Sequence, residues 1–186
     1  MSIVLRNIPN ILTALRLAAS PALVALLWRG HDYAALIVFV IAGATDALDG
    51  YLAKRFNLQS RFGRYMDPAA DKLLMLTSFI ALMVLGVTPI WLTALVITRD
   101  AAIVIGIGLA RLLALPVHAT PSFLGKVSTA VQVSYVGLML LLLTFDIHAR
   151  VLIGAAEIAV AVFTLVSGLG YAQIWLRAAT HSRRPA

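Results

Sequence analysis

Four aspartates carry the clearest chemical signal in this 186-residue chain, because they fall close together between positions 46 and 71. Asp46 and Asp49 are three residues apart, which places both on one face of a helix. The same holds for Asp67 and Asp71, which are four residues apart. Carboxylates gathered in an apolar surrounding repel one another, and either protonation or bound divalent cations relieve the repulsion. Because the chain has no cysteine, the pattern favours oxygen ligation of a hard cation such as Mg²⁺ or Mn²⁺.

Two glycines lie at helical spacing from these aspartates. Gly50 lies one turn after Asp46, and Gly63 lies one turn before Asp67. Glycine on the carboxylate face lets a ligand approach the backbone, whereas close packing of membrane helices is the structural alternative. The aspartates also have a structural alternative, in which they pair with nearby lysines and arginines at helix ends. The complete pattern, for which we favour a shared site, reads Asp46-x2-Asp49-Gly50-x2-Ala53-Lys54-x8-Gly63-x3-Asp67-x3-Asp71.

The elements that must position these residues are apolar helices. Hydrophobic residues make up 61% of the chain and charged residues 12%, a composition that cannot cover the surface of a soluble enzyme. Six apolar segments each have about 20 residues or more, the length that crosses a membrane as a helix. They run over 9–28, 33–54, 67–87, 90–113, 123–145 and 150–178. We therefore predict an all-α polytopic membrane protein, a six-transmembrane-helix bundle forming one domain, 1–186, with a short N-terminal interfacial helix at 2–8.

The basic residues predict how this bundle is oriented in the membrane. The formal net charge is +7, but lysines and arginines gather on one side, so we attribute the excess to topology and expect no nucleic-acid partner. That side holds Arg6, Lys54, Arg55, Arg61, Arg64, Arg111, Lys126, Arg177, Arg183 and Arg184, and the other holds Arg29 and Arg150. The positive-inside rule then puts both termini and the aspartate cluster at the cytoplasmic face. We expect an integral protein of a bacterial inner membrane.

The complete aspartate–glycine pattern closely resembles the signature of the CDP-alcohol phosphatidyltransferases. These are membrane enzymes of phospholipid synthesis with six transmembrane helices, and they usually form homodimers. The resemblance covers essentially the whole chain and implies the same fold, a homodimer and CDP-diacylglycerol as the first substrate. One position departs from the signature, because the family usually has arginine where this chain has Lys54, with Arg55 following. Which of the two side chains reaches the nucleotide diphosphate stays open.

The resemblance also implies roles for the residues of the signature. Two Mg²⁺ or Mn²⁺ ions would bridge the diphosphate, with Asp46 and Asp67 as ligands of both. Asp49 would complete the shell of one ion, and Asp71 would complete the other, act as general base, or do both. The residues expected to bind CDP-diacylglycerol are Gly50, Lys54, Arg55, Ser60 and Gly63.

The acceptor alcohol divides the family into two candidate subfamilies. The segment Asn7 to Thr13, followed by Arg16, resembles both phosphatidylglycerophosphate synthases and the eukaryotic-type cardiolipin synthases. Glycerophosphate-using enzymes usually carry Arg-Glu, then Ile-Ser and a further arginine about eight residues after the first. Here Arg99-Asp100 is followed by a next arginine only at Arg111, a pattern like that of the cardiolipin synthases. We therefore expect phosphatidylglycerol as acceptor, with glycerol-3-phosphate as the alternative.

Three cations are candidates for binding the acceptor: Arg99, Arg111 and Lys126. Arg99 lies near the middle of its apolar segment, where a cation is costly. Its structural alternative is an ion pair with an aspartate inside the bundle. A function of another class also fits an acidic cluster in a membrane, namely a small ion transporter or channel. That alternative predicts no release of CMP from CDP-diacylglycerol.

Overall fold

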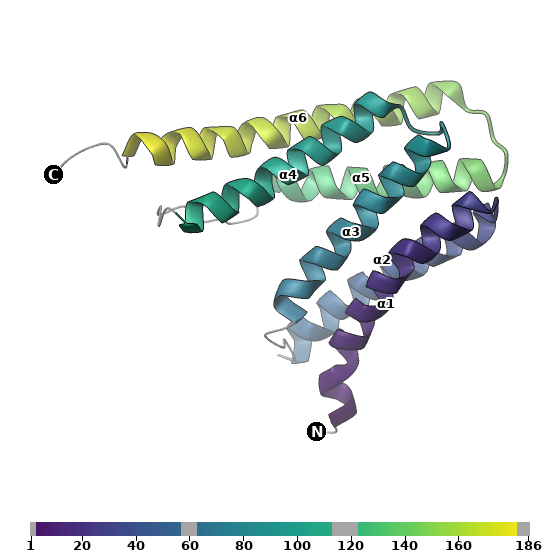
Figure 1. The fold of residues 1–186 in the computed structure, drawn as a ribbon, viewed down its shortest axis with the longest axis horizontal. Helices are drawn as coiled ribbons and strands as arrows, with labels where there is room; N and C mark the ends of the chain where they lie inside the picture. Colours follow the sequence, from purple (N-terminus) through teal and green to yellow (C-terminus); the bar gives the residue numbers. More distant parts are fainter. Residues whose placement is uncertain (1–2, 57–62, 113–122, 182–186) are drawn as a thin grey trace. The chain divides into compact units, whose positions relative to one another are not determined.

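The computed structural model describes residues 3–56, 63–112 and 123–181, with side chains over 11–46, 66–106, 108–109, 112 and 123–171 (Figure 1). This part of the chain consists of helices joined by short turns and contains no β-strand. The helices are α1 (Ile3–Trp28), α2 (Asp32–Phe56), α3 (Gly63–Val84), α4 (Ile90–Leu112), α5 (Phe123–Thr144) and α6 (Arg150–His181). The predicted all-α fold with six apolar helices is confirmed.

The helix ends fall close to the predicted ones, except at the N-terminus. Residues 2–8 were expected as a separate interfacial helix, and the described part of them, 3–8, instead forms the first turns of α1 without a break. The sequence offers no glycine or turn motif between the two stretches that would end a helix there. Three segments of the described chain are long and apolar enough to cross a membrane: Ile11–Trp28, Phe123–Thr144 and Arg150–Tyr171. That α2, α3 and α4 also span the membrane stays a prediction.

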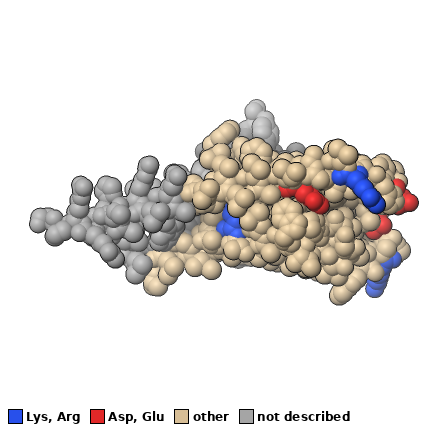
Figure 2. Space-filling view, turned by 90° about the horizontal axis from the view of Figure 1, so that it is seen from above, with Lys and Arg blue, Asp and Glu red and all other residues tan. Residues whose placement is uncertain are grey.

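The described helices carry many large apolar side chains on their outer surfaces. Leu15 of α1, Ile37 of α2, Val104 of α4 and Val151 of α6 are examples, and Val151 is 89% exposed. Figure 2 shows that charged side chains are sparse on one face of the described surface. A soluble protein rarely exposes so much contiguous apolar surface. This exposed apolar surface is consistent with a membrane protein.

Three of the described helices end in the same way. After α1, α3 and α5 the chain adopts a positive φ at Gly30 (72°), Gly86 (73°) and Asp146 (52°). At Gly30 the amide of the next residue, His31, donates to the carbonyl of Leu26 at 2.9 Å, and the Gly30 amide donates to Leu27 at 3.1 Å. This is a Schellman motif, which satisfies carbonyls at a helix C-terminus. At the end of α1 this cap lets α2 pack back against α1 within the first unit.

The chain divides into two compact units. The first comprises Met1–Thr88 and Val136–His148, and the second comprises Pro89–Tyr135 and Ala149–Ala186. In the first unit α1 packs against both α2 and α3 (Figure 1). In the second unit α4 packs against α6. The prediction of one domain over 1–186 stays a prediction.

The core of the first unit is built from stripes at helical spacing. On α1 every third or fourth residue is buried, in the order Thr13, Arg16, Ser20, Leu23 and Leu27. The matching stripe of α2 contains Ala35, Phe39 and Ala42, and that of α3 contains Leu74, Ser78 and Leu82. Small residues such as Ser20 and Ala35 let the helix backbones approach closely, as is common in membranes. The stripes of α2 and α3 continue, at the same spacing, to Asp46 and Asp71.

Candidate active site

One face of α1 changes from apolar to polar towards its N-terminus, and this face begins the site. Thr13, Arg16 and Ser20 have side chains that are 2%, 1% and 0% exposed. The Ser20 hydroxyl is satisfied within α1, because it donates to the carbonyl of Arg16 at 3.4 Å. Arg16 is a full charge inside a helix that is long and apolar enough to cross a membrane, and such a charge is costly there unless other groups compensate it. Its compensation comes from α2 and α3.

The guanidinium of Arg16 contacts one carboxylate from each neighbouring helix. Nη2 lies 3.0 Å from Oδ1 of Asp46 on α2, and Nη1 lies 2.7 Å from Oδ1 of Asp71 on α3. Two separate nitrogens of one planar group therefore hold two carboxylates that are 25 residues apart in the chain. Arginine can do this because its donors are fixed in a fork. Asp46 and Asp71 are 48% and 43% exposed, so each keeps surface for a further partner.

Thr13 brings the third aspartate to the same helix. Its hydroxyl donates a hydrogen bond to Oδ1 of Asp67 at the start of α3. Thr13 lies three residues before Arg16, so both side chains belong to one face of α1. The contacts of α1 with Asp46, Asp67 and Asp71 thus collect three carboxylates from two helices around one polar face.

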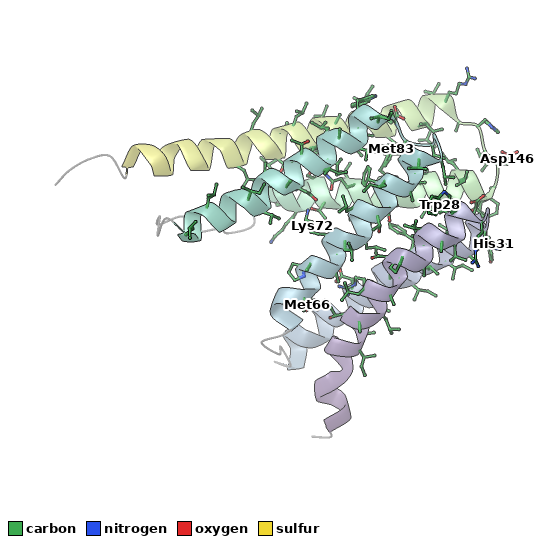
Figure 3. All side chains as sticks on the ribbon, in the orientation of Figure 1. Trp28, His31, Met66, Lys72, Met83 and Asp146 are labelled. Carbon is green, nitrogen blue, oxygen red and sulfur yellow. The ribbon has the colours of Figure 1, made fainter. Side chains whose placement is uncertain are left out.

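The charged groups lie at matching levels of the three helices. At a rise of 1.5 Å per residue, Arg16 is about 18 Å from the Trp28 end of α1. Asp46 is about 21 Å from the start of α2, and Asp71 about 20 Å from the end of α3. Figure 3 shows Met66 and Lys72, the sequence neighbours of Asp67 and Asp71, on the half of α3 away from Met83. The site therefore lies in the half of the first unit remote from its hairpin turn.

The other predicted residues of the signature are only partly described. Asp49, Gly50, Lys54 and Arg55 lie in the last turns of α2, and Gly63 begins α3. Their side-chain surroundings, and Ser60 as a whole, lie outside the described residues. Among the described side chains, no three acidic or histidine residues are close enough together to hold a metal ion. The side chain of Asp49 is not among those described. The predicted metal and nucleotide ligands therefore stay predictions.

The groups that are described fit a divalent cation in their chemistry. Asp46 and Asp71 already share one positive group, the Arg16 guanidinium, through one oxygen each. Carboxylate oxygens are also the ligands that Mg²⁺ and Mn²⁺ prefer. The arrangement thus already contains one cationic group, the guanidinium of Arg16. Asp67 is held by Thr13, which lies on the same face of α1.

The candidates for acceptor binding belong to the second unit. Arg99 on α4 is 8% exposed and pairs with its neighbour Asp100 at 2.7 Å. It also donates a hydrogen bond to the hydroxyl of Ser167 on α6, and its guanidinium carbon lies 5.9 Å from the ring centre of Tyr171. Lys126 is exposed near the start of α5, and the side chain of Arg111 lies outside the described set. The structural alternative foreseen for Arg99, an ion pair with an aspartate, is therefore present.

An apolar cavity lies beside Arg99, between α4 and α6. Its volume is about 340 Å³, and its lining includes Leu95, Ala102, Leu165 and Tyr171. Gly168 lies against the arginine stem, where a Cβ would be in ordinary van der Waals contact, 3.8 Å from Cγ of Arg99. Nε of Arg99 is buried and has no hydrogen-bond partner among the described residues. This part of the second unit therefore combines an apolar space with one largely neutralised cation.

Sequence reasoning missed two residues that organise the site. Thr13 and Arg16 were noted only as part of an N-terminal motif, and no site role was assigned to them. A signal was available for Arg16, because a charged residue in an apolar segment usually faces a polar partner. Thr13 had no such signal, since threonine is common in membrane helices and its partner lies 54 residues away.

Comparison with known proteins shows the family to which this chain belongs. A model of the CDP-alcohol phosphatidyltransferase family matches residues 6–168. The chain is 38% identical over 179 residues to a probable phosphatidylglycerophosphate synthase of Mycobacterium tuberculosis, covering 92% of this chain and 82% of the relative. It is 38% identical over 129 residues to a cardiolipin synthase (CMP-forming) of Streptomyces coelicolor, covering 66% and 60%. It is also 32% identical over 182 residues to a CDP-diacylglycerol–glycerol-3-phosphate 3-phosphatidyltransferase of Bacillus subtilis, covering 89% and 93%. The chain is therefore an enzyme of the CDP-alcohol phosphatidyltransferase family.

Proposed function

We propose that this enzyme transfers the phosphatidyl group of CDP-diacylglycerol to phosphatidylglycerol, which yields cardiolipin and CMP. Membership of a transferase family supports a group transfer and leaves no role for the transporter alternative. The observation that carries the reaction site is the gathering of Asp46, Asp67 and Asp71 by one face of α1. Cardiolipin synthases are among the relatives of this chain, which supports the choice of product.

Divalent metal ions, which the family generally uses, complete the proposed site. We assign Asp46, Asp49, Asp67 and Asp71 as the residues that hold two Mg²⁺ or Mn²⁺ ions. Such ions neutralise the diphosphate and make CMP a better leaving group. Because the family signature supplies the same four positions, the assignment rests on the sequence for Asp49 and on both sequence and contacts for the other three.

The chain's own residues then handle the substrates. Lys54 or Arg55, together with Gly50, Ser60 and Gly63, is assigned to the CDP group. Asp71 is assigned as the general base, since its half-exposed carboxylate can accept the proton of the acceptor hydroxyl. The acceptor oxygen forms a bond to the phosphorus that carries diacylglycerol, and the bond from that phosphorus to the CMP oxygen breaks. The proton passes to Asp71, and CMP leaves with the bonding electron pair.

The surroundings of Arg99 support a lipid acceptor. Asp100 neutralises most of the Arg99 charge, and the adjoining cavity is apolar. Glycerol-3-phosphate is a small dianion, which needs several cations and gains nothing from an apolar wall. Phosphatidylglycerol carries a single negative charge and has acyl chains that match an apolar cavity. A role for Arg99, Arg111 and Lys126 in acceptor binding is part of this proposal.

Phosphatidylglycerophosphate synthesis is the second candidate. Two relatives that cover most of this chain carry names of that activity. In that case the acceptor is glycerol-3-phosphate, and the assignment of the carboxylate site is unchanged. We further propose a homodimer in a bacterial inner membrane, with both termini and the active site on the cytoplasmic side, where the basic residues gather.

The two acceptors can be distinguished in one experiment. Purified enzyme in detergent receives CDP-diacylglycerol and Mn²⁺ with either phosphatidylglycerol or glycerol-3-phosphate, and the products are separated by thin-layer chromatography. We expect cardiolipin to accumulate and glycerol-3-phosphate to be used poorly. Phosphatidylglycerophosphate as the dominant product would refute the proposed acceptor and leave the carboxylate site intact. If neither acceptor supports CMP release, both candidate reactions are refuted.

A further inference from the structure

Arg16 is a positive charge that the reaction scheme above does not use. Its side chain is 1% exposed, yet it contacts the two aspartates Asp46 and Asp71 that we assign to metal binding. A buried cation beside metal ligands repels any other cation that approaches them, and so lowers its binding affinity. Its role can therefore be tested through the metal as well as through the reaction.

We propose that Arg16 is a positioning residue that serves as the resident counter-cation of the carboxylate site. Its guanidinium holds Asp46 and Asp71 at one centre and competes with divalent cations for their negative charge. The proposal rests on the proposed function in one respect, namely that these aspartates hold the metal ions.

The geometry favours a positioning role over a single ion pair. Nη1 contacts Asp71 at 2.7 Å and Nη2 contacts Asp46 at 3.0 Å, so α2 and α3 are tied to the same point of α1. Lysine could not reproduce this arrangement, because an ammonium is one point charge without a fork. The hydrogen bond from Nη1 thus orients Asp71, and the ion pair with Nη2 draws Asp46 to the same guanidinium.

The burial pattern shows how a metal ion and Arg16 can share these ligands. Arg16 covers the inner side of the carboxylates, whereas Asp46 and Asp71 remain 48% and 43% exposed. Each carboxylate can therefore accept a second partner on its exposed side while the guanidinium keeps it in place. Because the guanidinium remains close, it repels that second cation and weakens its binding.

Two opposite effects follow for a variant that lacks the charge. Without metal, Arg16→Gln leaves the carboxylates to repel one another, so the protein is less stable. With metal, the same variant binds the ion more tightly, because the competing charge has gone. A ligand that binds more tightly to the native state also stabilises it more. A purely structural arginine would instead cause the same loss of stability with and without metal.

The test measures Mn²⁺ binding and unfolding on the full-length protein in detergent. Free Mn²⁺ is followed by electron paramagnetic resonance during titration of wild type, Arg16→Gln and Arg16→Lys. The unfolding midpoint is measured for each protein with EDTA and with Mn²⁺. Arg29→Gln is the matched control, because it makes the same change in an exposed residue after the far end of α1.

We expect Arg16→Gln to bind Mn²⁺ about tenfold more tightly than wild type, the size of effect that a close charge has on a carboxylate. Arg16→Lys should show a smaller increase, because its charge remains but no longer bridges both aspartates. Arg29→Gln should match wild type. The rise of the unfolding midpoint on adding Mn²⁺ should be larger in Arg16→Gln than in wild type.

Unchanged or weaker Mn²⁺ binding in both Arg16 variants would overturn the proposal. If Arg16→Gln does not fold, the Mn²⁺ affinity of Arg16→Lys decides the test, because a smaller increase in affinity is expected for that variant. A wild-type protein that binds no Mn²⁺ would refute the proposed metal site and this inference together. Wild-type binding without any increase in the variants would refute the inference alone.

Discussion

Replacing both Asp46 and Asp71 by asparagine should destabilise the metal-free protein by more than the two single replacements added together. Arg16 is 1% exposed and contacts both carboxylates, so each single variant still leaves it one of the two. The double variant removes both of these ion pairs at once. The guanidinium cannot move to water without disturbing the packing of α1 against α2 and α3.

The magnitudes follow from burial. A hydrogen bond to a charged group contributes about 1.5–3 kcal/mol, and an ion pair at the surface about 0–1 kcal/mol. Because Asp46 and Asp71 are roughly half exposed, each single change should cost about 1 kcal/mol. Breaking a buried ion pair by removing one partner costs about 3–5 kcal/mol, and loss of both carboxylates at once moves Arg16 towards that case. The expected coupling between the two sites is thus about 1–3 kcal/mol.

Reversible unfolding by dodecyl sulfate in mixed micelles, with EDTA present, measures these free energies. Asp32→Asn is the matched control, since it makes the same change in the first turn of α2 and should not couple with Asp71→Asn. Additivity of Asp46→Asn and Asp71→Asn within about 0.5 kcal/mol would show that Arg16 is not shared between the two carboxylates.

Three further predictions concern the nucleotide, the turns and the metal. Lys54→Ala should weaken binding of CDP-diacylglycerol by about 1.5–3 kcal/mol, and Arg55→Ala by less, because one charge-assisted contact to phosphate is lost. The opposite order in equilibrium binding would assign that contact to Arg55. Gly30→Ala should lower the free energy of unfolding by about 1 kcal/mol and Asp146→Gly should raise it by up to about 1 kcal/mol, because both positions have positive φ. A loss of stability in Asp146→Gly would contradict this account of the turn. Dialysis against excess EDTA should abolish CMP release and added Mn²⁺ should restore it, whereas full activity after dialysis would exclude a required metal.

The helices could be predicted from the sequence because length and hydropathy decide them. Runs of about 20 apolar residues have few alternatives to a helix in a membrane, and Gly30 and Gly86 mark turns that need a positive φ. The start of α1 was predicted less well. A separate interfacial helix was expected at 2–8, whereas α1 runs without a break from Ile3 to Trp28.

The site was predictable in its residue types and only partly in its partners. The spacing of Asp46, Asp67 and Asp71 placed each on a helix face, and the contacts from α1 bring these faces together. The roles of Thr13 and Arg16 depend on which helices pack side by side. Helical spacing within one segment contains no information about a partner more than 50 residues away.

Release of CMP from CDP-diacylglycerol tests the central claim most directly, that the carboxylates gathered by α1 perform the transfer. Wild type, Asp46→Asn, Asp67→Asn and the control Asp32→Asn are compared in detergent with Mn²⁺ and phosphatidylglycerol. We predict CMP release by wild type and Asp32→Asn, and none above background by Asp46→Asn or Asp67→Asn. Near-normal release by either of these two variants would contradict the account, because the site would then lie elsewhere in the chain.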